Sequence, residues 1–160
     1  MALEKYLAIA GLALSIFFVA EIITVFNFMI NPSDSADFGF EAAPKIFQFI
    51  SLSIAPATIV FGVSFVLSKR YGSKLNGMLM ITAGVIILAG MILAYTMIEH
   101  IQEKLIDTSV EATPIIFMIV SIPIIFFGIR LLKTKPRKPK KSYLEAVSYT
   151  HLTLPTILLV

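Results

Sequence analysis

The sequence predicts an all-α membrane protein with four transmembrane helices, and three observations lead to this fold class. Hydrophobic residues make up 58% of the 160-residue chain and charged residues 14%, whereas about a quarter of a soluble domain is charged. Four apolar runs reach the length of roughly 20 residues that crosses a bilayer. Most Lys and Arg residues lie before the first run, between the second and third runs, and after the fourth. These segments face the same side of a membrane when each run crosses it once.

The predicted spans cover about residues 7–30, 46–67, 77–98 and 114–132, and they form one transmembrane domain over residues 1–132. Charged or turn-forming residues bound each run. The first run is longer than the roughly 7–15 apolar residues in the core of a cleavable signal peptide. We therefore expect it to remain in the protein as the first transmembrane helix.

The distribution of charge predicts that the N and C termini are both cytoplasmic. The loops after the first and third spans are acidic, and they hold only two of the 13 basic residues, Lys45 and Lys104. Because Lys and Arg favour the cytoplasmic side, we expect these loops outside a prokaryotic-type cell membrane. The other eleven bases lie on the opposite side of the spans: Lys5, Lys69, Arg70, Lys74, Arg130, Lys133, Lys135, Arg137, Lys138, Lys140 and Lys141.

A short internal repeat relates the second and fourth spans. Residues 41–51 read EAAPKIFQFIS and residues 111–121 read EATPIIFMIVS, and each copy opens its span from the acidic side. Duplication would give two repeated hairpins in the same orientation. Convergence is the alternative, because Pro is favoured in the first helical turn.

Small residues predict which helix faces pack, because helices in lipid associate through small and polar side chains. We expect these faces to bring the first three helices together, or to contact another chain. Pro56 and Pro123 lie inside spans and predict kinks. The predicted faces are Ala55, Thr58 and Gly62 with Ser51 on the second span, Gly90 and Ala94 with Ala83 on the third, and Ala10, Ala13, Phe17, Ala20, Thr24 and Asn27 on the first.

Glu21 is a carboxylic acid inside the first apolar run. A carboxylate at the bilayer centre costs about 2.5–3.5 kcal/mol, so we expect Glu21 to face the bundle. No Lys or Arg lies at its depth, which favours a neutral, hydrogen-bonded carboxyl over a buried ion pair. The candidate polar site consists of Glu21 and the polar residues at similar depth: Gln48, Ser51 and Ser53, Tyr95 and Thr96, and Ser121.

The dipeptide Ala20-Glu21 resembles the first helix of the small multidrug resistance transporters. The resemblance covers two or three residues, and the chain differs from that family in its lack of Trp, its acidic loops and its basic tail. It implies only that Glu21 takes up and releases protons. The alternative is that Glu21 joins helices or contacts a partner subunit.

Residues 99–107, EHIQEKLID, are expected to continue the third span as a helix that projects from the membrane or lies on its surface. Ile98, Ile101, Leu105 and Ile106 would form its apolar face. His100 and Glu103 lie one turn apart, and Glu99 lies one turn before Glu103, a spacing that suits two or three metal ligands. A solvated polar face is the commoner outcome, and we expect no metal site here.

Two further segments follow the fourth span. Residues 133–146 contain six bases and two prolines in a run of nine, so we expect a disordered cytoplasmic tail. Residues 147–156, VSYTHLTLPT, resemble one translated frame of a transposase sequencing adapter at every position, and we expect residues 147–160 to be a non-native read-through product. The expected anionic-lipid contacts, with no nucleic-acid partner, are Lys133, Lys135, Arg137, Lys138, Lys140 and Lys141.

The sequence contains no recognisable catalytic set. Cys is absent, which excludes thiolate metal sites and iron–sulfur clusters, and no nucleophile–base pair or phosphate-binding glycine loop is apparent. We expect no cofactor and no enzymatic activity. The leading hypothesis is an accessory or scaffold subunit of a membrane complex, with a membrane-protein partner or further copies of itself. The alternative is a proton-coupled small-molecule transporter or channel in which Glu21 titrates.

Overall fold

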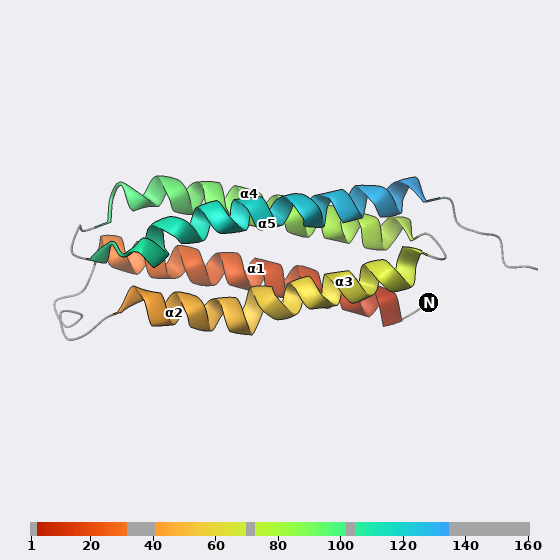
Figure 1. Ribbon diagram of the computed structural model, residues 1–160, viewed down its shortest axis with the longest axis horizontal. Helices are drawn as coiled ribbons and strands as arrows, with labels where there is room; N and C mark the ends of the chain where they lie inside the picture. The colour runs from red at the N-terminus through yellow and green to blue at the C-terminus, as the bar shows by residue number, and fades with distance from the viewer. Residues whose placement is uncertain (1–2, 32–40, 70–72, 102–104, 135–160) are drawn as a thin grey trace, which may run out of the picture.

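The fold is a bundle of four helical rods. The computed structural model describes residues 3–31, 41–69, 73–101 and 105–134, and all regular structure within these ranges is helical. Each rod is long and apolar enough to cross a membrane, which confirms the predicted fold class. Figure 1 shows the rods lying side by side along the long axis of the molecule.

The rods follow the chain in order, and the second consists of three joined helical pieces. Each rod begins a few residues before the predicted span, and in α4 and α5 a polar residue caps the first turn. Ser73 Oγ accepts from the Asn76 N–H at 3.4 Å, and Asp107 Oδ1 accepts from the Thr108 N–H at 2.8 Å. Such caps satisfy N–H groups that have no partner within the helix. The elements are α1 (Leu3–Ile30), α2 (Ala42–Phe49), a π-helical segment (Ile50–Ile54), α3 (Ala55–Lys69), α4 (Lys74–Ile98) and α5 (Thr108–Lys133).

The rods form a square in cross-section. α4 packs most extensively on α5 and next on α1, α1 also packs along α3, and the second rod meets α5 more sparsely. The neighbours α1 and α4 run in the same direction, as do the second rod and α5 (Figure 1). The two copies of the predicted repeat therefore open neighbouring, parallel helices at the same end of the bundle. Their origin by duplication stays a prediction.

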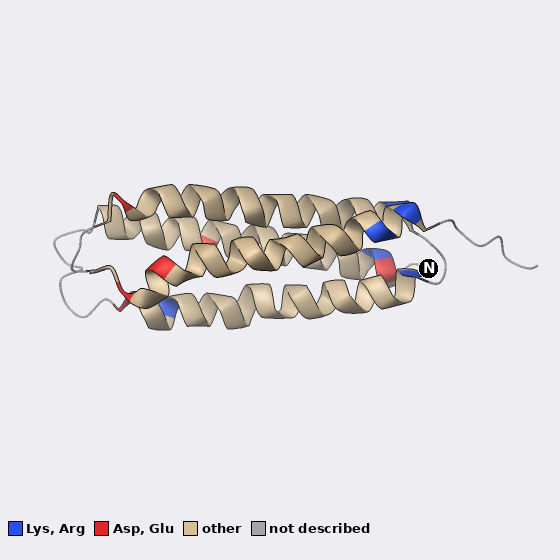
Figure 2. Cartoon of the chain, turned by 45° about the horizontal axis from the view of Figure 1, so that its top comes forward, with Lys and Arg blue, Asp and Glu red and all other residues tan. Residues whose placement is uncertain are grey.

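The charged residues separate to the two ends of the bundle. Figure 2 shows Lys and Arg gathered at the end that carries the N-terminus, and Asp and Glu mostly at the other. We call these the basic end and the acidic end. Glu4 at the basic end and Lys45 at the acidic end are the described exceptions. The tail residues 135–160, with five of the six predicted lipid-binding bases, lie outside the described residues.

The interior is built from large apolar side chains of all four rods. Phe18 and Phe26 of α1, Phe61 of α3 and Met91 of α4 are almost fully buried. Phe18 packs edge-on against Phe117 of α5, with ring centroids 4.7 Å apart. α1 therefore turns its large residues inward, and this decides the outcome for the small ones.

The small-residue stripe predicted for the first span does not pack inside the bundle. Ala10, Ala13, Phe17, Ala20, Thr24 and Asn27 are all exposed. The buried face of α1 instead carries Ala8, Gly11, Ser15, Phe18, Val19, Ile22, Phe26 and Met29. α1 is apolar around its whole circumference, so hydropathy did not distinguish its inner face from its outer face. The small residues, which were used to choose between them, lie on the outer face.

The prolines affect their helices differently. Pro56 follows the π-helical segment, in which the Ala55 N–H donates to the Ile50 carbonyl five residues earlier. Proline has no N–H to continue an α-helical ladder, and here the chain changes helix type just before it. α5 continues as one helix through Pro114 and Pro123.

The predicted helical continuation after the third span is not observed. α4 ends at Ile98, and Glu99 and His100 form a turn. Ile101 is 5% exposed and belongs to the core. Because Ile101 is buried, the chain at this point lies against the bundle and does not project from it as a helix. Glu103 lies outside the described residues.

Candidate functional site

Glu21 forms a polar contact between two rods. Ser53 Oγ donates a hydrogen bond to Glu21 Oε2 at 2.7 Å. Ser53 is fully buried and Glu21 is half-buried, so the contact lies at the edge of the interior. It joins α1 to the π-helical segment of the second rod.

The helix geometry explains why Ser53 makes this contact and Ser51 does not. Residues two apart in a helix point about 200° apart, so only one of the two serines can face α1. Ser51 is exposed, and its hydroxyl donates to the Phe47 carbonyl at 2.9 Å. The widened turn at Ile50–Ile54 sets which serine faces inward.

The other predicted members of the polar site lie elsewhere. Gln48 and Tyr95 are exposed. Ser121 is buried on α5, where its hydroxyl donates to the Met118 carbonyl of its own helix at 2.6 Å. Thr96 is exposed and bonds to the Leu93 carbonyl at 2.8 Å. Among the described residues, none of these four hydrogen-bonds to Glu21, so the predicted cluster reduces to the Glu21–Ser53 pair.

Several other buried hydroxyls are occupied by backbone carbonyls. Ser15 donates to the Gly11 carbonyl at 2.8 Å, Ser64 donates to the Glu4 carbonyl at 3.1 Å, and Thr113 donates to the Ser109 carbonyl. A serine or threonine hydroxyl that donates a hydrogen bond to a backbone carbonyl needs no ligand to satisfy it. Within the part of the chain that the structure describes, these groups do not connect with Glu21–Ser53 into a longer polar path.

A second interhelical polar contact lies at the basic end. Asn76 Nδ2 donates to Ser68 Oγ at 2.7 Å, and both residues are fully buried. Asn76 Oδ1 has no hydrogen-bond partner among the described residues. The sequence reasoning missed this pair, although a polar residue in the first turn of a membrane helix was the available signal.

The closest helix contacts are made at glycines. A Cβ on Gly77 would lie 2.8 Å from the Gly128 carbonyl oxygen, and a Cβ on Gly128 would lie 2.8 Å from the Gly77 oxygen. A Cβ on Gly84 would meet Ile125 of α5 at 2.5 Å. We call the line through Gly77, Gly84 and Gly128 the glycine seam of α4 and α5. Sequence reasoning noted Gly128 with Ser121 as the small residues of the fourth span, and it missed Gly77 and Gly84 as packing residues.

The predicted packing residues divide into packed and unpacked positions. On α4, Ala94 is fully buried, and a Cβ on Gly90 would clash with Val19 of α1. On α3, Ala55 and Thr58 are half-buried. The placement of Gly62 corrects its predicted role within the bundle, because a Cβ there would meet no atom within 4 Å.

The exposed face of α1 differs in character from the other exposed helix faces. It carries Ala10, Ala13 and Ala20, with the exposed Phe17 between Ala13 and Ala20, then Thr24 and Asn27 toward the acidic end; we call these six residues the α1 outer face. Elsewhere α1 exposes large side chains such as Tyr6, Ile9 and Ile16. The faces of the other rods expose mainly large side chains, among them Leu52, Ile59 and Val66 on the second, Met78, Val85 and Ile92 on α4, and Ile119, Ile122 and Phe126 on α5. Helices in lipid approach one another most closely at small residues.

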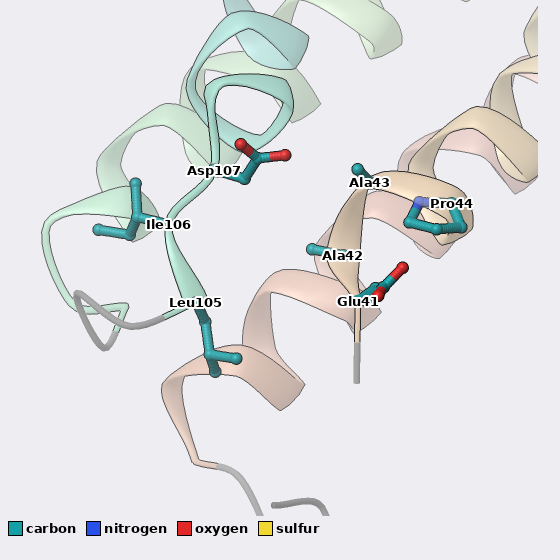
Figure 3. A pocket seen from close by; sticks show the side chains of 7 residues that line it. All are labelled: Glu41, Ala42, Ala43, Pro44, Leu105, Ile106 and Asp107. Carbon is teal, nitrogen blue, oxygen red and sulfur yellow. The ribbon is translucent and has the colours of Figure 1, made fainter. Parts of the chain in front are cut away.

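An open groove separates the second rod from α5 near the acidic end. Its deeper part has a volume of about 380 Å³ and is lined by Ile46, Phe47 and Ile50 on one side and by Thr108, Ser109, Ala112, Thr113, Ile116 and Phe117 on the other. Its mouth has a volume of about 270 Å³ and is lined by Glu41, Ala42, Ala43 and Pro44 and by Leu105, Ile106 and Asp107 (Figure 3). We call the two parts together the α2/α5 groove.

The described residues contain no group of three or more His, Asp or Glu that could hold a metal ion. Of the predicted lipid-binding bases, Lys133 is exposed at the end of α5, at the basic end. Comparison with known proteins finds no matching family model, no matching curated relative and no matching solved structure.

Proposed function

We propose that this protein is a non-catalytic subunit of a membrane complex, and that it docks a transmembrane helix of a partner protein on the α1 outer face. The observation that carries the proposal is the position of the alanines. Ala10, Ala13 and Ala20 lie on the exposed side of α1 rather than in its packed face.

Small residues on the lipid side of a helix let another helix approach closely. Helix association in lipid depends on close van der Waals contact and on interhelical hydrogen bonds. The alanines permit such contact along α1. Asn27, near the acidic end of the same face, adds an exposed amide that can donate and accept hydrogen bonds with a partner.

The hydrogen bonds of the buried polar groups also support a structural role. Glu21 is paired with Ser53, and other buried hydroxyls are satisfied by carbonyl groups. A transport pathway needs polar groups that remain available to a substrate or to protons. The groups described here are instead occupied: the Ser53 and Ser64 hydroxyls bond to another helix, and those of Ser15 and Thr113 bond to their own helix.

The partner proposal can be tested by blue-native electrophoresis of the chain extracted gently from its own membrane. We expect the wild type to migrate within a complex larger than the chain or its simple multiples. Ala13→Phe together with Ala20→Phe should release the chain from the complex, because large side chains at these positions keep another helix away from α1. Ala89→Phe is the matched control, since Ala89 is an exposed alanine on α4, and this variant should stay in the complex.

Two results would contradict the partner proposal. One is a wild-type chain that always migrates alone. The other is a wild-type chain that migrates only as multiples of its own mass, which would assign the α1 outer face to contact between copies.

We further propose that the basic end faces the cytoplasm of a prokaryotic-type cell, where Lys133 and the tail bases meet anionic lipid. The separation of charge between the two ends supports this orientation. A cysteine at Glu99 should react with an impermeant reagent added to intact cells, and a cysteine at Lys74 should react only after lysis. The reverse pattern would invert the topology.

A proton-coupled transporter or channel is the second candidate, and the Glu21–Ser53 contact is the observation that favours it. Carboxyl groups inside membrane spans recur in proton relays. In this case Glu21→Gln should abolish proton-coupled uptake into liposomes that contain the purified protein. Unchanged uptake by the variant would remove this candidate.

A further inference from the structure

The α2/α5 groove runs along two parallel helices and opens at the acidic end. The residues that line its mouth, 41–44 and 105–107, are followed directly in the chain by those that line its deeper part. The two parts of the groove therefore form one continuous groove between the second rod and α5. The groove exists because the second rod and α5 meet only sparsely there.

The deeper part of the groove presents an apolar surface to the bilayer. Ile46, Phe47 and Ile50 face Ile116 and Phe117 across it. The hydroxyl of Thr113, one of the few polar groups in the lining, is already bonded to the Ser109 carbonyl. Water gains nothing from such a surface, whereas a hydrocarbon chain fills it without losing any hydrogen bonds.

The polar groups at the mouth of the groove complement the charges of a zwitterionic headgroup. Asp107 and Glu41 are the acidic residues of its lining, and Lys45 is not among the lining residues. Figure 3 shows the Asp107 side chain directed toward α2, and the Glu41 carboxyl group on the side of α2 away from Asp107. The first N–H groups of α2, at Ala42 and Ala43, have no side-chain cap from Glu41, and uncapped helix N-termini favour phosphate oxygens.

We propose that the α2/α5 groove is a binding site for one phospholipid with a primary ammonium headgroup, drawn from the leaflet that meets the acidic end. One acyl chain lies between Ile46–Ile50 and Ala112–Phe117. The ammonium group lies against the Asp107 carboxylate, with Glu41 adding negative charge at the edge of the mouth, and the phosphate lies toward the start of α2. The proposal is independent of the partner helix on α1, which occupies another face of the bundle.

The headgroup chemistry follows from the sign of the charges at the mouth. An anionic phospholipid would bring its net negative charge to two carboxylates with no lining base to offset them. A headgroup with an ammonium group instead gains charge-assisted hydrogen bonds to the carboxylate oxygens. The same acyl chain therefore binds with different affinity according to its headgroup.

The test uses the full chain, delipidated in detergent and titrated with phosphatidylethanolamine or phosphatidylglycerol of identical acyl chains, with bound lipid measured by native mass spectrometry. We expect tighter binding of phosphatidylethanolamine by about fivefold or more. Glu41→Gln with Asp107→Asn should bring the ratio close to one. Asn retains a cap acceptor for the Thr108 N–H, and Glu41 makes no cap bond, so α2 and α5 should stay intact. Glu99→Gln, an acidic-end control outside the lining, should leave the ratio unchanged.

The acyl-chain site has its own pair of variants. Ala112→Phe should fill the groove and lower the occupancy of both lipids severalfold. Ile122→Phe adds an aromatic ring to the exposed face of α5 away from the lining and should not change occupancy. Equal binding of the two lipids by the wild type would overturn the proposal. So would an equal loss of lipid in Ala112→Phe and Ile122→Phe. The charge variants decide the headgroup assignment even if Ala112→Phe fails to fold.

Discussion

α5 has two neighbours, and it meets them in opposite ways. Against α4 it forms the glycine seam, where Gly77 and Gly128 bring the two backbones together. Against the second rod it leaves the α2/α5 groove, of about 380 Å³ in its deeper part. Both contacts join helices of similar hydropathy, so overall apolarity does not decide how closely helices pack in this bundle.

The difference teaches that the side chains at each contact set its tightness. In lipid there is no hydrophobic force to press two apolar helices together, and close approach depends on small residues. The glycine seam provides them at intervals of seven residues on α4. At the groove, the second rod instead presents Ile46, Phe47 and Ile50, whose large side chains keep the backbones apart.

The largest effect on this comparison is expected from closing the space at the glycine seam. Gly128→Ala places a methyl group 2.8 Å from the Gly77 oxygen and 3.0 Å from the Ile81 nitrogen. Backbone atoms cannot turn aside, so we expect the free energy of unfolding to fall by about 1–3 kcal/mol. Unfolding by SDS in mixed micelles measures it. Gly62→Ala is the control, since open space surrounds Gly62, and it should be neutral or stabilising.

A smaller effect is expected at the polar contact between Ser68 and Asn76. Ser68→Ala removes the oxygen that accepts from Asn76 Nδ2 and leaves a fully buried amide without that bond. We expect a loss of about 1 kcal/mol in the same assay. Ser51→Ala, at an exposed serine bonded to its own helix, should cause no measurable loss. Equal effects of the two substitutions would show that the Ser68–Asn76 bond does not hold the helices.

The Glu21 series tests the contact between α1 and the second rod. Glu21→Gln is nearly isosteric and can still accept from Ser53, so it should preserve stability. Glu21→Leu should cost about 0.6 kcal/mol and at most about 1.7 kcal/mol, the range for interhelical hydrogen bonds in membranes. Glu21→Lys brings a base without an acid and should be the least stable of the three. If Leu is more stable than both Glu and Gln in detergent, Glu21 is not held inside the bundle.

The smallest effect is expected inside the α2/α5 groove. Ala112→Leu adds atoms to a wall that borders open space, so no backbone must move. We expect the free energy of unfolding to change by no more than about 0.5 kcal/mol. A loss as large as that of Gly128→Ala would show that the groove is closed in the folded protein.

The sequence predicts the helices well because length and hydropathy suffice for a membrane span. The ends of α1 and α4 match the predicted spans, while α4 and α5 begin earlier because Ser73 and Asp107 cap them outside the apolar runs. The packed faces were not predictable in the same way. A helix that is apolar all round gives no amphipathic signal, and α1 buries Phe18 and Phe26 while exposing its alanines.

The candidate site was predictable in part. The position of Glu21 within the first run indicates that it faces the bundle, and Ser53 was among the residues expected at its depth. The choice of Ser53 over Ser51 depends on the π-helical segment, and no residue pattern in Ile50–Ile54 announces it. The glycine seam was missed because Gly77 and Gly84 lie outside the small-xxx-small spacing that was sought.

The π-helical segment also has a consequence for how this chain tolerates insertions and deletions. A π turn holds one residue more than an α turn, so Ile50–Ile54 amounts to a single-residue insertion that the helix absorbs without breaking. Deletion of one residue there, such as the exposed Ser51, would restore a continuous α-helix. It would also rotate α2 relative to α3 by about 100°. Ile46 and Phe47 would leave the wall of the groove, while α3 would keep its place against α1. A single codon thus controls the rotational setting of the acidic half of the second rod.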